Sequence, residues 1–247
     1  MSSSPQRALA RLQTEVVACN RCPRLREHCI RIAQTKRKSY QNSDYWGRPV
    51  PSFGPFDAKV LLIGLAPGAH GANRTGRMFT GDRSGDFFFR ALYETGFASQ
   101  PTSVARGDGL ELTDCRITAP VRCAPPDNRP DPPEFEACRP FLQRELALLP
   151  HVQVVVALGN LALRAYLRVL KEAGRIEKFS PYPFSHGSVH PMDTDLPTLL
   201  CCYHHSQQNT QTGRLTADMM RLALLEARRL AGLNLSKNTS TKGSRTI

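Results

Sequence analysis

The sequence predicts an α/β domain with three layers, in which helices cover both faces of a central, mostly parallel four-stranded sheet. Short apolar runs alternate with amphipathic helical patterns, which is typical of parallel strands joined by crossover helices. The run "KVLLI" at 59–63 is continuously apolar, which is typical of a strand that is buried on both faces. The length of 247 residues suits one such domain, which we place at residues 1–233.

The elements follow one another in order along the chain. Apolar runs predict strands at 59–63, 115–121, 152–159 and 196–204. Amphipathic periodicity predicts helices at 6–19, 84–97, 131–150, 160–174 and 212–232. Residues 30–57 are polar and rich in proline without a clear period, and residues 234–247 form a polar tail that we expect to be disordered. The cysteine-bearing segment before the first strand is therefore an N-terminal attachment to the domain.

Charge and hydropathy restrict the class of protein. The chain has 33 Lys and Arg against 21 Asp and Glu, a net charge of +12, which favours polyanionic partners. Charge alone leaves nucleic-acid binding and a merely solvated basic surface equally open. The longest apolar runs fall short of the roughly 20 residues of a membrane span, and "MSSSPQRALARLQ" has no signal-peptide core. We expect an intracellular, cytoplasmic protein without a membrane segment.

Eight cysteines in a reducing compartment call for an explanation other than disulfides. Cys19 and Cys22 form a Cys-x-x-Cys pair, and 14 residues separate Cys123 from Cys138. Four thiolates suit either zinc or an iron–sulfur cluster. The wide spacing of the second pair favours the cluster over a zinc ribbon. The alternative is that Cys123 and Cys138 are inert buried thiols, and Cys29 has no assigned role.

Three unusual segments follow predicted strands. They are the loop from Gly64, the stretch "VRCAPPDNRPDPPEFEAC" at 121–138 and "HHSQQNTQTGR" at 204–214. In open α/β sheets the ligand lies beyond the carboxyl ends of the strands, so we expect one shared site. The glycine-rich loop lacks the Gly-Lys-Ser/Thr ending of a phosphate-binding loop. A nucleotide-dependent transferase is therefore not supported.

The motifs as a set resemble the uracil-DNA glycosylase superfamily, and specifically its type 5 (B-type) members. The resemblance covers about residues 10–232. It rests on "GLAPGAHG" at 64–71, "GRMFTGD" at 76–82, "VRCAPPDNRP" at 121–130 and "YHHSQQNTQTGRLT" at 203–216. It implies a [4Fe–4S] cluster on Cys19, Cys22, Cys123 and Cys138, with zinc as the alternative. It also implies hydrolysis of the N-glycosidic bond to uracil in DNA, with hypoxanthine and xanthine as further bases, by a protein that we expect to be a monomer.

The resemblance also implies a pocket for a base that has left the duplex stack, as glycosidic-bond chemistry requires. Phe79 would stack on that base, although a Phe in this position can also be core. Gly64, Leu65 and Ala66 would bring the backbone close to base and sugar. Asn128 would contact the base, with an ordinary turn asparagine as the alternative.

Two further residues would act on the scissile bond. Many members of the superfamily have a polar or acidic residue where this chain has Leu65, and the type 5 resemblance instead indicates Asp82 as the group that orients water or stabilises the sugar cation. Asp82 can alternatively cap the following helix. Asp86 would then be the second candidate for the catalytic carboxylate. His204 would donate a hydrogen bond to the uracil oxygen as a neutral imidazole. The adjacent His205 leaves open which of the two rings faces the base.

The remaining candidates would hold DNA. Gln207, Gln208, Asn209 and Arg214 lie in the last motif, where side chains can enter a duplex gap and a helix start can bind phosphate. Arg74 and Arg77 could add charge along the backbone, or all of these can be solvated loop residues. The alternative function is a non-catalytic iron–sulfur protein that recognises damaged or single-stranded nucleic acid. The polar residues Asp82, Asn128 and His204 at the strand ends favour catalysis.

Overall fold

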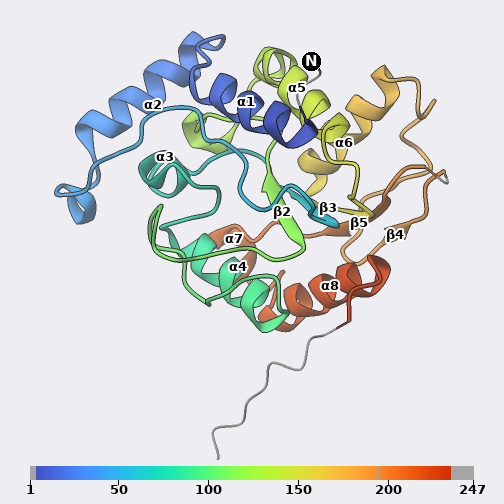
Figure 1. Ribbon diagram of the computed structural model, residues 1–247. Helices are drawn as coiled ribbons and strands as arrows, with labels where there is room; N and C mark the ends of the chain where they lie inside the picture. The colour runs from blue at the N-terminus through green and yellow to red at the C-terminus, as the bar shows by residue number, and fades with distance from the viewer. Residues whose placement is uncertain (1–3, 194, 235–247) are drawn as a thin grey trace, which may run out of the picture.

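A five-stranded sheet lies at the centre of the computed structural model, which describes residues 4–193 and 195–234 (Figure 1). The strand order is β2-β1-β3-β5-β4, and all neighbours are parallel except β4 and β5. The strands are β1 (Val60–Ile63), β2 (Cys115–Thr118), β3 (Val154–Leu158), β4 (Val189–His190) and β5 (Thr198–Cys202). The predicted α/β class with a mostly parallel sheet is confirmed.

The number of strands differs from the prediction. The four predicted strands are present, and β4 adds a two-residue antiparallel edge next to β5. Two residues are too few to show a hydrophobic pattern in the sequence, so no periodicity indicated this strand. The predicted strand 115–121 ends at Thr118, and the predicted strand 196–204 ends at Cys202.

Helices cover both faces of the sheet. The helices α1 (Pro5–Val17), α5 (Pro132–Ala147) and α6 (Asn160–Glu172) pack on one face, and α4 (Arg83–Glu94) and α8 (Ala217–Leu230) pack on the other (Figure 1). Alternate residues of β1 belong to the two cores, with Leu61 on the α1 side and Leu62 on the α4 side. This is why β1 and β3 have no polar face, whereas β2 turns Arg116 and Thr118 toward the buried carboxylate of Glu145.

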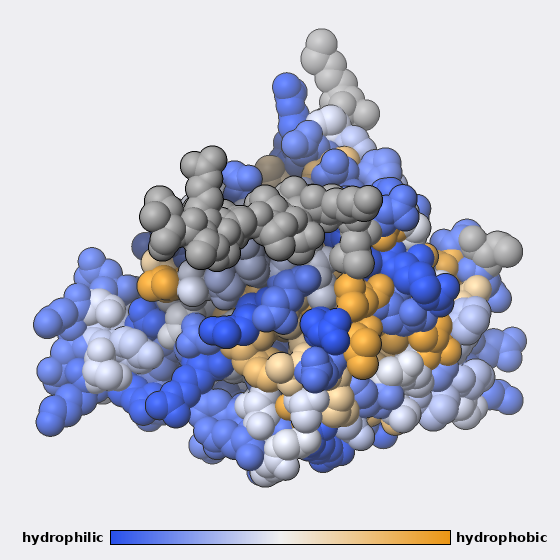
Figure 2. All heavy atoms as spheres, turned by 90° about the horizontal axis from the view of Figure 1, so that it is seen from below, coloured by the Kyte–Doolittle hydropathy of each residue, from blue (hydrophilic) through white to orange (hydrophobic). Residues whose placement is uncertain are grey.

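The face that carries α4 and α8 is seen from below in Figure 2. Most of its exposed residues are hydrophilic, and hydrophobic residues gather near its middle and to one side. Within the described residues, no helix is both long enough and apolar enough to cross a membrane.

The structure also contains helical segments that the periodicity missed. The helix α2 (Pro23–Thr35) occupies residues of which 30–35 were expected to be irregular, so that expectation is wrong. Only Leu25 and Cys29 of α2 are buried, which makes its apolar stripe too narrow to show in the sequence. The other short elements are α3 (Ala72–Thr75), α7 (Gln207–Gln211), η1 (Lys38–Tyr40) and η2 (Pro126–Asn128).

The closing helix is shorter than predicted. It begins after Thr216, whose side chain accepts a hydrogen bond from the Met219 amide, rather than at residue 212. The expected disordered tail lies outside the described residues from residue 235 onward.

Candidate active site and cysteine cavity

Phe79 lies against the glycine loop that follows β1. A Cβ atom at Gly64 would lie 2.4 Å from Cζ of Phe79, so only glycine allows the ring this close. The backbone of Phe79 has a φ of 53°, which is uncommon for an aromatic residue and indicates strain at a functional position. The ring is partly exposed and makes edge contacts with Phe88 and His205. Phe79 therefore stands at the loop as a base-stacking role would require.

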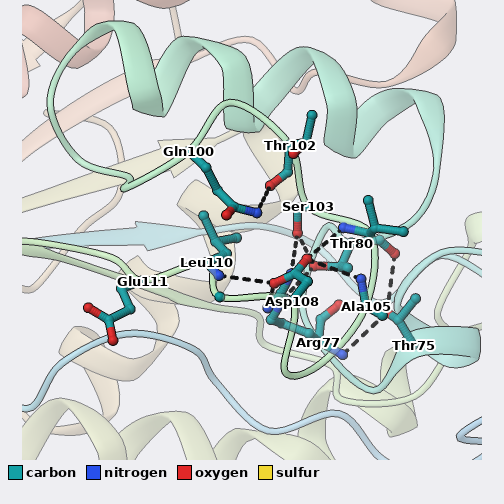
Figure 3. Close-up of polar contacts among 12 residues, drawn as sticks. Thr75, Arg77, Thr80, Gln100, Thr102, Ser103, Ala105, Asp108, Leu110 and Glu111 are labelled. Atoms are coloured by element: carbon teal, nitrogen blue, oxygen red, sulfur yellow. Dashed lines mark hydrogen bonds and ion pairs between the residues drawn. The ribbon is translucent and has the colours of Figure 1, made fainter.

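The turn that carries Phe79 is held by buried polar contacts around Arg77 (Figure 3). The guanidinium of Arg77 donates to both carboxylate oxygens of Asp108, over 2.9 and 2.6 Å. It also donates to the hydroxyls of Thr80 and Ser103. Arg77 is 5% exposed, so it supports the turn from inside and is not available to DNA, contrary to the earlier suggestion. Such a network can hold Phe79 in its strained conformation.

Asp82 uses its two carboxylate oxygens differently. Oδ1 accepts a hydrogen bond of 2.9 Å from the Gly85 amide and so caps α4. Oδ2 faces the glycine loop, because a Cβ atom at Gly71 would lie 2.0 Å from it and one at Gly68 would lie 3.1 Å from it. Burial raises the pKa of Asp82, although amide hydrogen bonds oppose this. The cap reading is thus correct for one oxygen, and the second oxygen is turned toward the loop.

His204 and His205 form a stack at the end of β5. The ring of His205 lies between Phe88 and His204, with centroids 4.4 and 4.7 Å away and interplanar angles of 9° and 11°. His205 is completely buried, and within the described residues neither ring nitrogen has a hydrogen-bond partner. Burial lowers the pKa of His204 to about 4 and that of His205 well below its usual value. Both imidazoles are therefore neutral at physiological pH.

His204 rather than His205 reaches a cavity. It lines a space of about 360 Å³ together with Leu65, Asn160, Tyr203 and Arg214. The centroid of its ring lies 6.2 Å from that of Phe79. The geometry is that of an outer, accessible imidazole supported by an inner, enclosed one.

Hydrogen bonds join these motifs across the chain. The hydroxyl of Ser84, in the first turn of α4, donates to the carbonyl of His205 over 2.6 Å. The amide of Asn209 donates to the carbonyl of His204 over 2.7 Å. Asn209 therefore positions the histidine segment instead of standing free for DNA. Neither contact was indicated by the sequence, because both depend on side chains that meet only in the folded chain.

The other predicted residues are more exposed. Gln207 and Gln208 are exposed on α7, and Arg214 lies over the ring of Tyr203 at 4.8 Å. Asp86 is exposed in the first turn of α4. Asn128 ends η2 with an exposed side chain and a φ of 56°, and within the described residues no hydrogen bond joins it to Phe79, Asp82 or His204.

His70 and Arg74 join the glycine loop to its surroundings. The Tyr45 hydroxyl and Nδ1 of His70 are 2.9 Å apart. Arg74 donates to the carbonyls of His70 and Gly81, so it holds two loops together.

The four predicted ligand cysteines line one small cavity. Cys19, Cys22, Cys123 and Cys138 surround a space of about 20 Å³, which also has Arg122 and Arg26 in its wall. Burial raises the pKa of Cys22, and the nearby thiols of Cys123 and Cys19 raise it further. Within the described residues, no group of three or more His, Cys, Asp or Glu is close enough to hold a single metal ion. Four cysteines around one cavity are a donor set that suits zinc or an iron–sulfur cluster.

A fifth cysteine adjoins this cavity. Cys29 is completely buried, and a hydrogen bond with the Cys123 thiol lowers its pKa. Cys22 and Cys29 are seven residues apart, which is two turns of α2 and places them on the same side of that helix. Since α2 was not predicted, this spacing was not recognised in the sequence.

A buried ionic network centred on Glu145 adjoins the cysteine cavity through Arg122. Glu145 is 0% exposed and accepts hydrogen bonds from Arg116, Arg122, Ser52 and Thr118. Burial would raise the pKa of Glu145, but the two guanidinium groups hold it at about 2. Arg122 directly precedes Cys123, so the network anchors the segment that carries this thiol.

Comparison with known proteins agrees with this geometry. The model of the uracil DNA glycosylase superfamily matches residues 51–228. The chain belongs to this superfamily. A "type-5 uracil-DNA glycosylase" of Thermus thermophilus is 49% identical over 221 residues, which are 88% of this chain and 96% of that protein.

Two more type-5 relatives show the same extent of similarity. One from Mycobacterium bovis is 46% identical over 228 residues, 92% of this chain and 83% of its own. One from Pyrobaculum aerophilum is 43% identical over 218 residues, 88% of this chain and 91% of its own. The resemblance read from the motifs is thus confirmed at the level of the family.

Proposed function

We propose that this protein hydrolyses the N-glycosidic bond between uracil and deoxyribose in DNA and leaves an abasic site, as a monofunctional DNA-repair glycosylase. The membership in the superfamily supports the activity. The observation that carries the chemistry is the meeting of three motifs: Phe79 packs on Gly64, Asp82 faces Gly68 and Gly71, and His204 stands beside Phe79. These side chains come from two strand ends, since Phe79 and Asp82 follow β1 and His204 follows β5, and the ligand of an open α/β sheet lies at such ends.

The first step is the binding of a nucleotide that has left the duplex. Uracil would stack on the partly exposed ring of Phe79. The glycine loop then leaves room for the sugar beside the carboxylate of Asp82. Asn128, exposed on η2, would approach the base from the loop after β2.

Asp82 and His204 would act on opposite ends of the scissile bond. As the bond breaks, positive charge develops on the sugar and negative charge on uracil. The free oxygen Oδ2 of Asp82 would stabilise the sugar cation or orient the attacking water. The neutral imidazole of His204 would donate a hydrogen bond to the uracil oxygen, because its low pKa leaves an N–H without a positive charge.

The cysteine cavity would hold a [4Fe–4S] cluster through Cys19, Cys22, Cys123 and Cys138, with zinc as the alternative. The convergence of four thiols from the connection between α1 and α2, from α5 and from the loop after β2 supports this assignment. The positive charges of Arg26 and Arg122 would offset the negative charge of thiolate ligands. The bound cluster would supply a structural cross-link between the N-terminal helices and the domain.

The remaining parts of the proposal concern the substrate bases, the oligomeric state, the location in the cell and the DNA contacts. Hypoxanthine and xanthine in DNA would be further substrates, and the protein would act as a monomer on DNA in the cytoplasm. Gln207, Gln208 and Arg214 would contact the DNA around the extruded nucleotide, since all three are exposed next to His204.

Single-turnover cleavage of labelled duplexes tests this function. Each duplex carries one uracil, hypoxanthine, xanthine or undamaged base and is treated with alkali after reaction. Strand breaks at uracil and none at the undamaged base are the expected result. Intact uracil DNA with retained binding would contradict the catalytic proposal and favour a non-catalytic recognition protein.

A further inference from the structure

A second, larger cavity lies between α5, α6 and residues 179–184. It has a volume of about 710 Å³, and neither Phe79 nor Asp82 belongs to its wall. We call it the α5–α6 groove. Its wall is both aromatic and basic, with the rings of Phe135, Phe179, Tyr182 and Phe184 and the guanidinium groups of Arg139, Arg164 and Arg168.

The α5–α6 groove adjoins the cavity beside His204. Asn160, Leu161 and Phe184 line both spaces. At their junction, a Cβ atom at Gly159 would lie 3.3 Å from Cβ of His204. The start of α6, with Asn160 and Leu161, therefore lies between the position proposed for the extruded base and the groove.

The charged groups of the groove are free to bind an anion. Within the described residues, Arg164 and Arg168 form no ion pair, whereas Arg139 is held by Glu172 at 2.7 Å. Glu136 is the acidic residue in the groove wall. Leu161, Arg164 and Arg168 follow at helical spacing on α6 and are all exposed. Along α6, the groove wall therefore has the apolar side chain of Leu161 followed by the positive charges of Arg164 and Arg168.

Aromatic rings accompany these cations. The guanidinium of Arg168 lies 5.6 Å from the ring centroid of Phe179, and the next cavity repeats the arrangement with Arg214 over Tyr203 at 4.8 Å. Grooves that bind single-stranded nucleic acid combine cations for the phosphates with rings on which bases stack. A duplex cannot use such rings, because its bases are already stacked on one another.

We propose that the α5–α6 groove binds the single-stranded DNA that flanks the extruded nucleotide. The proposal depends on the proposed glycosylase function only for the position of that nucleotide at His204. The groove then favours uracil in unpaired DNA over uracil in a duplex. A polypeptide is the less suitable occupant, since the groove and the adjoining cavity each pair a ring with a cation, which suits a polyanion with planar bases.

The test measures the binding of fluorescein-labelled (dT)12, which contains no uracil, by anisotropy. The variant Arg164→Glu/Arg168→Glu should bind about tenfold more weakly than wild type. If each arginine contacts one phosphate, the slope of log K against log salt should fall by about 1.4. Phe179→Leu should weaken binding and leave that slope unchanged, because it removes a ring and no charge.

The matched control is Arg221→Glu/Arg229→Glu, which makes the same change of charge on α8, on the opposite face of the sheet (Figure 1). It should bind (dT)12 within about twofold of wild type after correction for net charge. Thermal melting of all variants checks that they are folded. Equal affinity of the groove variant and the control for (dT)12 would overturn the proposal.

Uracil excision separates this proposal from the proposed function. The groove variant should excise uracil from a duplex at the wild-type single-turnover rate and require about tenfold more protein for a single strand. If wild type excises no uracil but the groove variant still loses (dT)12 binding, the glycosylase function fails and the groove assignment stands. If excision occurs and (dT)12 binding is unchanged in the variant, the groove assignment fails alone.

Discussion

Glu145 and His205 are both completely buried, yet the protein keeps one charged and the other neutral. Glu145 lies beneath the cysteine cavity, where two arginines and two hydroxyls hydrogen-bond to its carboxylate. His205 lies next to the candidate active site, where aromatic rings cover it and, among the residues that the structure describes, no group bonds to its nitrogens. Burial penalises charge equally in both places, so the neighbours decide the protonation state. The charged network at Glu145 suits the cysteine cavity, which must be held firmly. The neutral environment of His205 suits the candidate active site, where His204 has to donate a hydrogen bond without a positive charge.

The largest effect is expected where a buried charge loses its partner. Glu145→Gln keeps the side-chain volume but leaves the guanidinium groups of Arg116 and Arg122 without a countercharge. The free energy of unfolding should fall by about 3–5 kcal/mol, as measured by urea denaturation. The comparison is His205→Phe, which removes no hydrogen bond and should change stability by less than about 1.5 kcal/mol. Equal losses in the two variants would show that the ionic contacts contribute nothing beyond packing.

The next largest effect is on catalysis at Asp82. Asp82→Asn keeps an oxygen that can cap α4 but removes the negative charge that faces the glycine loop. The single-turnover rate of uracil excision should fall by about 10²–10³-fold, with DNA affinity retained. Asp82→Ala should lose the cap as well and about 1 kcal/mol of stability. An Asn variant that cleaves at the wild-type rate would leave capping as the sole role of Asp82.

The glycine loop offers a graded test of the same geometry. An alanine at Gly71 would bring Cβ to 2.0 Å from Oδ2 of Asp82, whereas one at Gly68 would lie at 3.1 Å. Gly71→Ala should therefore displace the carboxylate and lower the excision rate by up to about 100-fold. Gly68→Ala should have a clearly smaller effect in the same assay. The reverse order would indicate that the position of the carboxylate does not limit the reaction.

The smallest expected effect is the pH dependence of stability from the histidine stack. The folded pKa of His204 is about 4, below the unfolded value of 6.5, so the unfolded chain binds the additional proton between these values. Stability should fall as pH drops through 6.5, by about 2 kcal/mol between pH 7 and pH 5 from His204 alone, and His205, whose pKa is also lowered, should add to this fall. Urea denaturation across this range measures it. The variant His204→Gln/His205→Phe should have a flatter profile, and an identical profile would contradict the assignment.

The sequence alone determined the layers of this protein. Uninterrupted apolar runs such as 59–63 and 152–159 can be buried only on both faces of a sheet, and the helical periods between them require crossovers. The position of the motifs after the strands indicated one shared site, whereas the roles of the motif residues came from the resemblance to the glycosylase family. The helix α2 was not predicted from the sequence, because it buries only Leu25 and Cys29 and so shows no clear apolar period.

The tertiary structure decided how the site residues are used. Arg77 became a buried support, Asp82 divided its oxygens between a cap and the loop, and His204 rather than His205 reached the cavity. Each outcome depends on contacts between segments far apart in the chain, such as Arg77 with Asp108 and Ser84 with His205. Residue type and spacing report local preference, whereas protonation, orientation and access are set by the neighbours that packing brings together.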